Sequence, residues 1–183
     1  MWIVHAGNRV DTPDRATARF PVTKVPAVEA RLRRLLAELR PSGVVSAAAA
    51  GADLLVLGAA ADLGIEIDVL LPLEVDDFVK RSVADQGDDW VERFERLLPD
   101  RAQATVADLS AYDDWYLRGN DLLLDRVAAR SEKAGEGVIV VTVRPAPGGP
   151  PSATDDLAAK AAARGWPIID IDPTDDRPWP GRW

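Results

Sequence analysis

The stretch Gly137-Val138-Ile139-Val140-Val141-Thr142-Val143 decides the fold class of this chain. It is apolar almost throughout and rich in β-branched residues, which is typical of a strand buried on both faces of a parallel sheet. A long helical pattern at residues 113–133 precedes it, and another at residues 153–164 follows it. A strand between two helices is the repeating unit of α/β proteins.

The same alternation extends to both ends of the chain. Short apolar runs predict further strands at residues 3–6, 44–47, 65–71, 103–109 and 167–171. Helical spacing predicts helices at residues 25–39, 53–63, 74–83 and 90–98. We therefore predict one α/β domain over residues 1–174, with a mostly parallel sheet of about six strands and helices on both faces. Residues 175–183 form a Pro- and Trp-containing tail, which either packs in extended form or contacts a partner.

Composition excludes several classes of function. The 183 residues include 22 Lys and Arg against 30 Asp and Glu, a formal net charge of −8. So acidic a chain lacks the broad basic face that duplex nucleic acid or an anionic membrane needs. The absence of cysteine excludes thiolate catalysis and zinc knuckles, and a single histidine argues against a His-rich metal site. We expect no metal and no cofactor.

Neither a leader nor a membrane span is visible. The N-terminus has no basic region before its first apolar run, as a signal peptide would. The longest apolar stretch, around Val44 to Ala50, is far shorter than the ~20 residues that cross a bilayer. We expect a cytoplasmic protein with no membrane partner.

The loop after the first strand is a candidate ligand site, because ligands of open parallel sheets bind beyond the carboxyl ends of the strands. Gly7 allows close approach of the backbone, Asn8 can donate or accept, and Arg9 can pair with phosphate. A turn with a solvated arginine is the alternative. His5, within the strand, is interpreted as a satisfied core histidine, with proton shuttling as the alternative.

The loop after the second strand opens a helix with small residues. Ala50 and Gly51 leave room for an anion at the helix N-terminus. Asp53 follows them, and we favour a capping role for it, as the N-cap or as an acidic residue of the first turn, over contact with a ligand.

The third strand ends in Leu71-Pro72, and Lys80, Arg81 and Ser82 follow on the next helix. These three residues are consecutive, so they cannot all face one point, and one or two of them reach a phosphate at most. Phe78 is interpreted as a core residue.

The loop after the fifth strand is the strongest ligand candidate. Two glycines permit tight curvature, hydroxyls can cap the next helix, and an arginine supplies positive charge. Its candidate residues are Arg144, Gly148, Gly149, Thr154 and Asp155. Arg144 joins Arg9, Lys80 and Arg81 at the same predicted edge, where a local positive site would suit a small phosphate-bearing ligand.

These loops, in this order, resemble the SLOG superfamily of Rossmann-like nucleotide-binding proteins. That group includes the LOG phosphoribohydrolases that activate cytokinins and the DNA-processing protein A domain. Five segments, spread over nearly the whole chain, carry the resemblance: Gly7-Asn8-Arg9; Ala18-Arg19-Phe20-Pro21; Ala49-Ala50-Gly51-Ala52-Asp53; Leu71-Pro72-Leu73 with Phe78, Ser82-Val83, Trp90 and Phe94; and Gly148-Gly149 with Thr154-Asp155. The resemblance implies a Rossmann-like domain that binds a nucleotide.

Three departures from the family pattern bear on catalysis. Asn8 stands where the family has His, and residues 150–153 separate the paired glycines from Thr154. Leu157 stands where the LOG enzymes carry the Glu of their catalytic set. The resemblance therefore implies nucleotide binding more firmly than hydrolysis, and we assign no catalytic residue.

Three functions remain open at this point. The first is binding or sensing of an AMP-like, ADP-ribose or cyclic ADP-ribose type molecule in stress or phage-defence signalling, with the chain as a possible homodimer. The second is an N-glycosidic-bond enzyme, a nucleotide phosphoribohydrolase or deoxyribosyltransferase-like, whose candidate carboxylates are Asp11, Asp53, Asp114 and Asp155. The third is an interaction protein without a ligand, which uses the tryptophans Trp115, Trp179 and Trp183.

Overall fold

β1 (Trp2–Gly7) is an interior strand of a six-stranded sheet in which every strand pair is parallel. The computed structural model describes residues 1–146 and 152–175. The strand order is β4-β3-β2-β1-β5-β6, with β2 at Gly43–Ser46, β3 at Glu66–Leu71, β4 at Thr105–Val106, β5 at Val138–Val143 and β6 at Ile168–Ile171. The predicted α/β class and strand number are confirmed, and the sheet is parallel throughout instead of mostly parallel.

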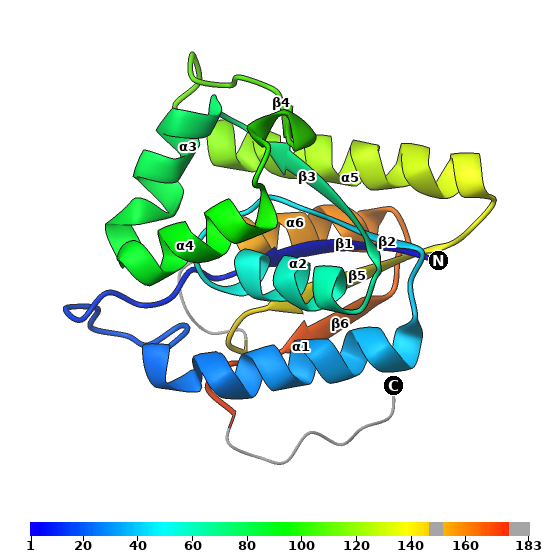
Figure 1. Cartoon of the computed structure of the whole chain (residues 1–183). Coiled ribbons are helices and arrows are strands. Elements are labelled where there is room, and N and C mark those ends of the chain that lie inside the picture. The colour runs from blue at the N-terminus through cyan, green and yellow to red at the C-terminus, as the bar shows by residue number, and fades with distance from the viewer. Residues whose placement is uncertain (147–151, 176–183) are drawn as a thin grey trace.

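Helices cover both faces of this sheet (Figure 1). α1 and α2 lie over one face, with α4 beside α2 and α3 contributing Phe78 to the same apolar cluster, and α5 and α6 lie over the other. Their bounds are α1 Val25–Leu39, α2 Ala52–Asp62, α3 Val75–Ser82, α4 Asp88–Leu97, α5 Trp115–Ala134 and α6 Ala153–Ala163. Among the described residues, none of the helices is both long enough and apolar enough to cross a bilayer.

The alternation of side chains along β1 divides the core in two. Ile3 belongs to the apolar cluster under α1 and α2, whereas Trp2 and Val4 belong to the cluster under α5 and α6. Successive residues of a strand point to opposite faces, so a strand buried on both faces must be apolar at every position. His5 follows this register on the same face as Ile3, and it is fully buried.

The strand order reverses beside β1. The chain moves outward from β1 through β2 and β3 to β4, then returns to place β5 on the other side of β1. The two strands stay in register to their carboxyl ends, where Gly7 is opposite Val143. Loops leaving β1 and β5 therefore diverge at this point, which is where open α/β sheets place their ligands.

The strand predicted at residues 103–109 is the least accurate prediction. Gln103 belongs to a short 3-10 helix (Arg101–Gln103), and only Thr105 and Val106 pair with β3. Asp108 then adopts a left-handed conformation, with φ of 36°, which turns the chain away from the sheet.

Most of the predicted tail, residues 176–183, lies outside the described residues. Its first residue, Asp175, accepts a hydrogen bond of 2.8 Å through its carbonyl from Arg31 Nη2.

Two glycines allow β1 to approach the start of α2. A Cβ on Gly7 would lie 2.2 Å from the Cβ of Ala52, which is far inside the contact distance of two carbon atoms. Gly51 has a φ of +109°, and a Cβ there would lie 2.8 Å from the carbonyl oxygen of Asn8. Neither position therefore accommodates a side chain without movement of the backbone.

We expect Gly7→Ala to lower the free energy of unfolding by about 1–3 kcal/mol or more, because the added methyl overpacks the contact with Ala52. Urea unfolding at neutral pH measures this. Gly58→Ala is the matched control, since nothing lies within 4 Å of a Cβ at this position in α2. Alanine there should stabilise the helix by about 0.5–1 kcal/mol. Equal effects of the two substitutions would contradict the close approach.

Candidate functional site

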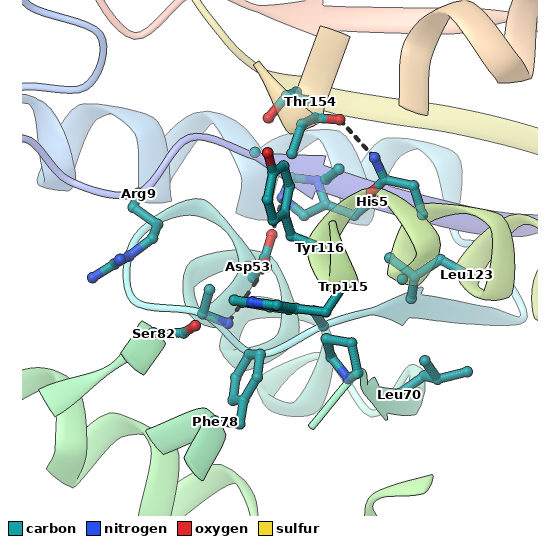
Figure 2. A pocket seen from close by; sticks show the side chains of 18 residues that line it. His5, Arg9, Asp53, Leu70, Phe78, Ser82, Trp115, Tyr116, Leu123 and Thr154 are labelled. Carbon is teal, nitrogen blue, oxygen red and sulfur yellow. Dashed lines mark hydrogen bonds and ion pairs between the residues drawn. The ribbon is translucent and has the colours of Figure 1, made fainter. Parts of the chain in front are cut away.

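A cavity of about 150 Å³ opens at the carboxyl edge of the sheet, beside the reversal of strand order (Figure 2). The end of β1, the loop after β2 and the start of α2 form one side of it. The end of β3, α3, and the first turns of α5 and α6 complete its wall. The lining residues extend from His5 in β1 to Thr154 in α6, so the cavity exists only in the folded chain.

The inner wall of the cavity carries a buried His–Asp pair. His5 Nε2 lies 3.5 Å from Asp53 Oδ1, and the two side chains are 0% and 10% exposed. The remaining oxygen of Asp53, Oδ2, accepts a long hydrogen bond of 3.4 Å from the backbone N–H of Ala49. Three buried atoms of this pair lack a hydrogen-bond partner of ordinary geometry within the described part of the chain. They are Nδ1 and Nε2 of His5 and Oδ1 of Asp53.

Burial moves the two pKa values in opposite directions. Desolvation lowers the pKa of His5 from 6.5 to about 3, against a smaller opposing contribution from the Val141 backbone. Desolvation also raises the pKa of Asp53 from 3.8 to about 7, although the Ala49 and Gly7 backbones and Arg9 oppose it. Below neutral pH the folded pair therefore holds one proton, and the proton resides on Asp53.

Asp53 is not the N-cap of α2, so that part of the prediction is wrong, but it is an acidic residue of the first helical turn, as the other part predicted. The residue at the N-cap position is Gly51, and no side chain caps the helix. Asp53 is the second helical residue, and its carboxyl turns back toward Ala49 and His5 instead of toward the free N–H groups of the first turn. The positive φ of Gly51 sets the direction of the helix and with it the direction of this side chain.

Aromatic side chains form the rest of the wall. Phe78 contributes from α3, and Trp115 and Tyr116 contribute from the first turn of α5 (Figure 2). The Trp115 and Tyr116 rings meet edge to face, with centroids 5.7 Å apart. Phe78 is buried, as predicted, and it lines the cavity as well. Tyr116 is 46% exposed and lies at the opening.

The contribution of α5 is the part that sequence reasoning missed. Gly119 and Asn120, one turn further along α5, also line the cavity. Asn120 Nδ2 donates to the Ala153 carbonyl at 2.8 Å and to Asp156 Oδ2 at 2.9 Å, which fixes α5 against α6. The two adjacent aromatic residues at the start of α5 were the sequence signal for this wall. The direction of their side chains depends on the crossover from β4 to β5, which the sequence pattern does not specify.

The structure brings together six of the predicted site residues. The cavity is lined by Gly7, Arg9, Asp53, Pro72, Ser82 and Thr154. Asn8 lies directly behind them, since its Oδ1 accepts a hydrogen bond of 3.4 Å from the buried hydroxyl of Thr154.

The other predicted residues do not line the cavity. Ala50 and Leu71 are buried in the core, and Gly51 is packed against the Asn8–Val10 backbone. Lys80 and Arg81 are exposed to solvent. Gly148 and Gly149 lie outside the described residues, so the loop interpreted as the strongest candidate is represented only by its two ends.

The four predicted cations do not converge on the cavity. Arg9 lines it, and its guanidinium forms an ion pair with Asp85 and donates to the Arg81 carbonyl at 3.4 Å. Arg144 is held by Asp155 at 2.9 Å and by Asp170 at 2.8 Å. Arg9 is therefore the cation closest to a ligand in the described part of the site.

Oxygens of the protein itself occupy part of the N-terminus of α2 and cap that of α6. In α2, the N–H of Ala52 donates to the Asn8 carbonyl at 3.3 Å. In α6, Ser152 and Asp155 form a reciprocal capping box, in which Asp155 Oδ2 accepts from the Ser152 N–H at 2.8 Å. An anion at either terminus would have to displace these bonds or lie beside them.

Of the four candidate carboxylates, Asp53 is the one that lines the cavity. Asp11 Oδ2 accepts from the backbone N–H groups of Arg19 and Phe20, each at 2.8 Å, and so closes the loop after β1. Asp114 pairs with Arg118 at the surface, and Asp155 belongs to the capping box. Across the described ranges, no cluster of three or more His, Cys, Asp or Glu side chains could hold a metal ion.

Comparisons with known proteins show similarity to one solved fold. No family model matches the sequence, and no curated protein matches it. Among solved structures, the chain is similar to the X-ray structure of DNA processing protein A (DprA) from Streptococcus pneumoniae, at 15% identity and a TM-score of 0.42. The match covers 91% of this chain and 57% of that one, so the chain spans little more than half the length of its neighbour. Membership of the SLOG superfamily stays a prediction.

Opposite pH slopes of stability in two single variants would test the His–Asp pair. Between about pH 4.5 and 6 the unfolded chain holds one proton on His5 and the folded chain holds one on Asp53, so the native pair adds no slope. Asp53→Asn leaves a proton in the unfolded state only, and its stability should rise with pH by about 1.4 kcal/mol per unit relative to the native chain. His5→Gln leaves a proton in the folded state only, and its stability should fall by a similar amount.

Urea unfolding at several pH values measures both slopes. The native chain serves as the reference because all other titrating groups are common to the three proteins. Variants whose stability ran parallel to that of the native chain over this range would show that the pair does not hold its proton as described.

Proposed function

We propose that the cavity binds the ring of a nucleotide-derived small molecule, of the AMP-like, ADP-ribose or cyclic ADP-ribose type. One observation carries this proposal: an aromatic-walled cavity with a buried, incompletely hydrogen-bonded Asp lies at the reversal of strand order. Pockets with mostly apolar walls and a few convergent polar groups are typical of small-molecule sites.

The size of the cavity favours a single ring over a whole nucleotide. At about 150 Å³ it equals an engineered apolar cavity that holds benzene. The remainder of a nucleotide would extend past Tyr116 toward solvent. The resemblance of the loops to the SLOG superfamily supports the same class of ligand, and a role in stress or phage-defence signalling rests on that resemblance alone.

Native mass spectrometry against AMP, NAD, ADP-ribose and the cyclic ADP-ribose isomers tests the proposal. A retained and unaltered ligand is the expected result for a sensor. Trp115→Ala should then weaken binding by about tenfold or more, because stacking of a base on an aromatic side chain contributes about 1–3 kcal/mol.

Tyr112→Ala is the matched control for this substitution. Tyr112 is 45% exposed, lies three residues before Trp115 and stacks under the Arg118 guanidinium, with no contact to the cavity. Its loss should leave the affinity unchanged. Equal weakening by both variants, or no binding of any nucleotide, would argue against the cavity as the site.

Cleavage of an N-glycosidic bond is the second candidate function, and Asp53 favours it. Such reactions need a carboxylate near C1 of the sugar to stabilise positive charge or to capture it, and Asp53 is the candidate carboxylate that lines the cavity. A carboxyl with a pKa raised to about 7 can donate or accept a proton at neutral pH.

If the chain is such an enzyme, long incubation with the same nucleotides should release a free base and a sugar phosphate. Asp53→Asn should abolish this release and spare ligand binding, since the amide keeps the shape but cannot titrate. Undiminished release by the variant would exclude Asp53 from catalysis.

If none of these nucleotides binds or is cleaved, the result would favour the third function, an interaction protein without a ligand. Trp115 lines the cavity and is partly buried, so it fits that role less well than its sequence position indicated. Trp179 and Trp183 lie outside the described residues. A homodimer and a cytoplasmic location stay predictions from the sequence.

A further inference from the structure

The chemistry of the inner wall limits which part of a ligand can reach it. Asp53 presents 10% of its side chain to the cavity, and His5 is buried behind it. The two hydrogen-bonding groups are incompletely paired, whereas the side chains opposite them are aromatic. A buried polar group without a full set of partners costs free energy, so a ligand that supplies a partner there gains affinity.

A phosphate is excluded from this end. Ionised Asp53 would repel it, and protonated Asp53 offers it a single donor beside a mostly apolar and aromatic wall. His5 stays neutral because burial lowers its pKa, so it supplies no positive charge. The positive group of the described site is Arg9, at the mouth, where it is 35% exposed.

We propose that the Asp53 carboxyl, supported by His5, binds the nitrogen edge of an uncharged heterocycle, while any phosphate on the same ligand stays at the mouth beside Arg9. This inference rests on the proposed function and deepens it by fixing the orientation of the ligand. A protonated carboxyl both donates and accepts, which complements a ring nitrogen next to an amino group. The aromatic walls then contact the faces of the planar ring.

Binding of such a ring should depend on pH. The titratable and charged groups around Asp53 are His5 from β1, Arg9 from the loop after β1 and Tyr116 from α5. Asp53 is the member of this group that changes charge near neutrality, as its pKa is about 7. Above that pH it can only accept, so affinity for a neutral ring should fall as pH rises from 6 to 8.

Adenine and ribose 5-phosphate are suitable probes, because the first is the uncharged ring alone and the second is the phosphate without the ring. Calorimetry with adenine should show that Asp53→Leu weakens binding by about tenfold at pH 6, since the apolar side chain keeps the volume and loses the hydrogen bonds. Asp53→Asn should bind within about threefold of the native chain and lose the pH dependence. Ribose 5-phosphate should neither compete with adenine nor respond to either substitution.

His5 is tested as a positioning residue. His5→Gln should shift the pH midpoint of adenine binding, which a purely structural role would not do. If Asp53→Leu does not fold, the pH profiles of the native chain and of Asp53→Asn still decide the proposal. A flat native profile, or binding of ribose 5-phosphate that depends on Asp53, would overturn it.

Failure of the inference and failure of the proposed function give different results. Nucleotide binding that needs Trp115 but ignores Asp53 would retain the function and overturn the orientation. Adenine binding that needs Asp53, with no binding of AMP or ADP-ribose, would support the heterocycle site and reject the nucleotide. If none of the probes binds, both the proposed function and the inferred orientation would be rejected.

Discussion

The contact between Gly7 and Ala52 determines the geometry of the whole site. It lets the end of β1 touch the first residue of α2, where any side chain on Gly7 would keep the two apart. Asp53 follows Ala52 and His5 precedes Gly7 by two residues, so the close approach, together with the direction that Gly51 gives to α2, brings the carboxyl and the imidazole to 3.5 Å. The inner wall of the cavity is therefore a consequence of one missing methyl group.

Burial of this pair has a cost that the surrounding core must offset. A charge transferred into an apolar interior loses its solvation, and below about pH 7 both groups avoid that loss by being neutral. The apolar clusters on the two faces of the sheet supply the compensating stability. Elsewhere the chain pairs its buried carboxylate, as Asp68 does with Arg126 at 2.8 Å and Arg130 at 2.6 Å. Among the described residues, no Lys or Arg forms an ion pair with Asp53, and Arg9 lowers its pKa only in part, which distinguishes it from Asp68.

Much of the fold could be predicted from the sequence, because it depends on local patterns. Continuous β-branched runs at 138–143 and helical spacing at 25–39 define elements whatever their neighbours are. The candidate site was harder to predict from the sequence, because its residues come together only through the strand order. Pro72, Ser82 and Thr154 follow from strand ends, whereas Trp115 and Asn120 face the cavity because α5 crosses back over β1. The role of Asp53 depended on the φ of Gly51, which residue type alone does not set.

The position of β1 between β2 and β5 also determines the order in which parts of the chain can fold. β1 is synthesised before the other five strands of the sheet, yet its pairing partner β5 begins only at Val138. Until then one edge of β1 has no hydrogen-bonding neighbour, and the wall that α6 contributes from beyond β5 is missing as well. Pairings so distant in sequence form late, because closing the loop between them costs entropy before any contact is gained. The nascent chain therefore carries an open, apolar strand edge until β5 pairs with β1, and α6 then completes the cavity before β6 completes the sheet.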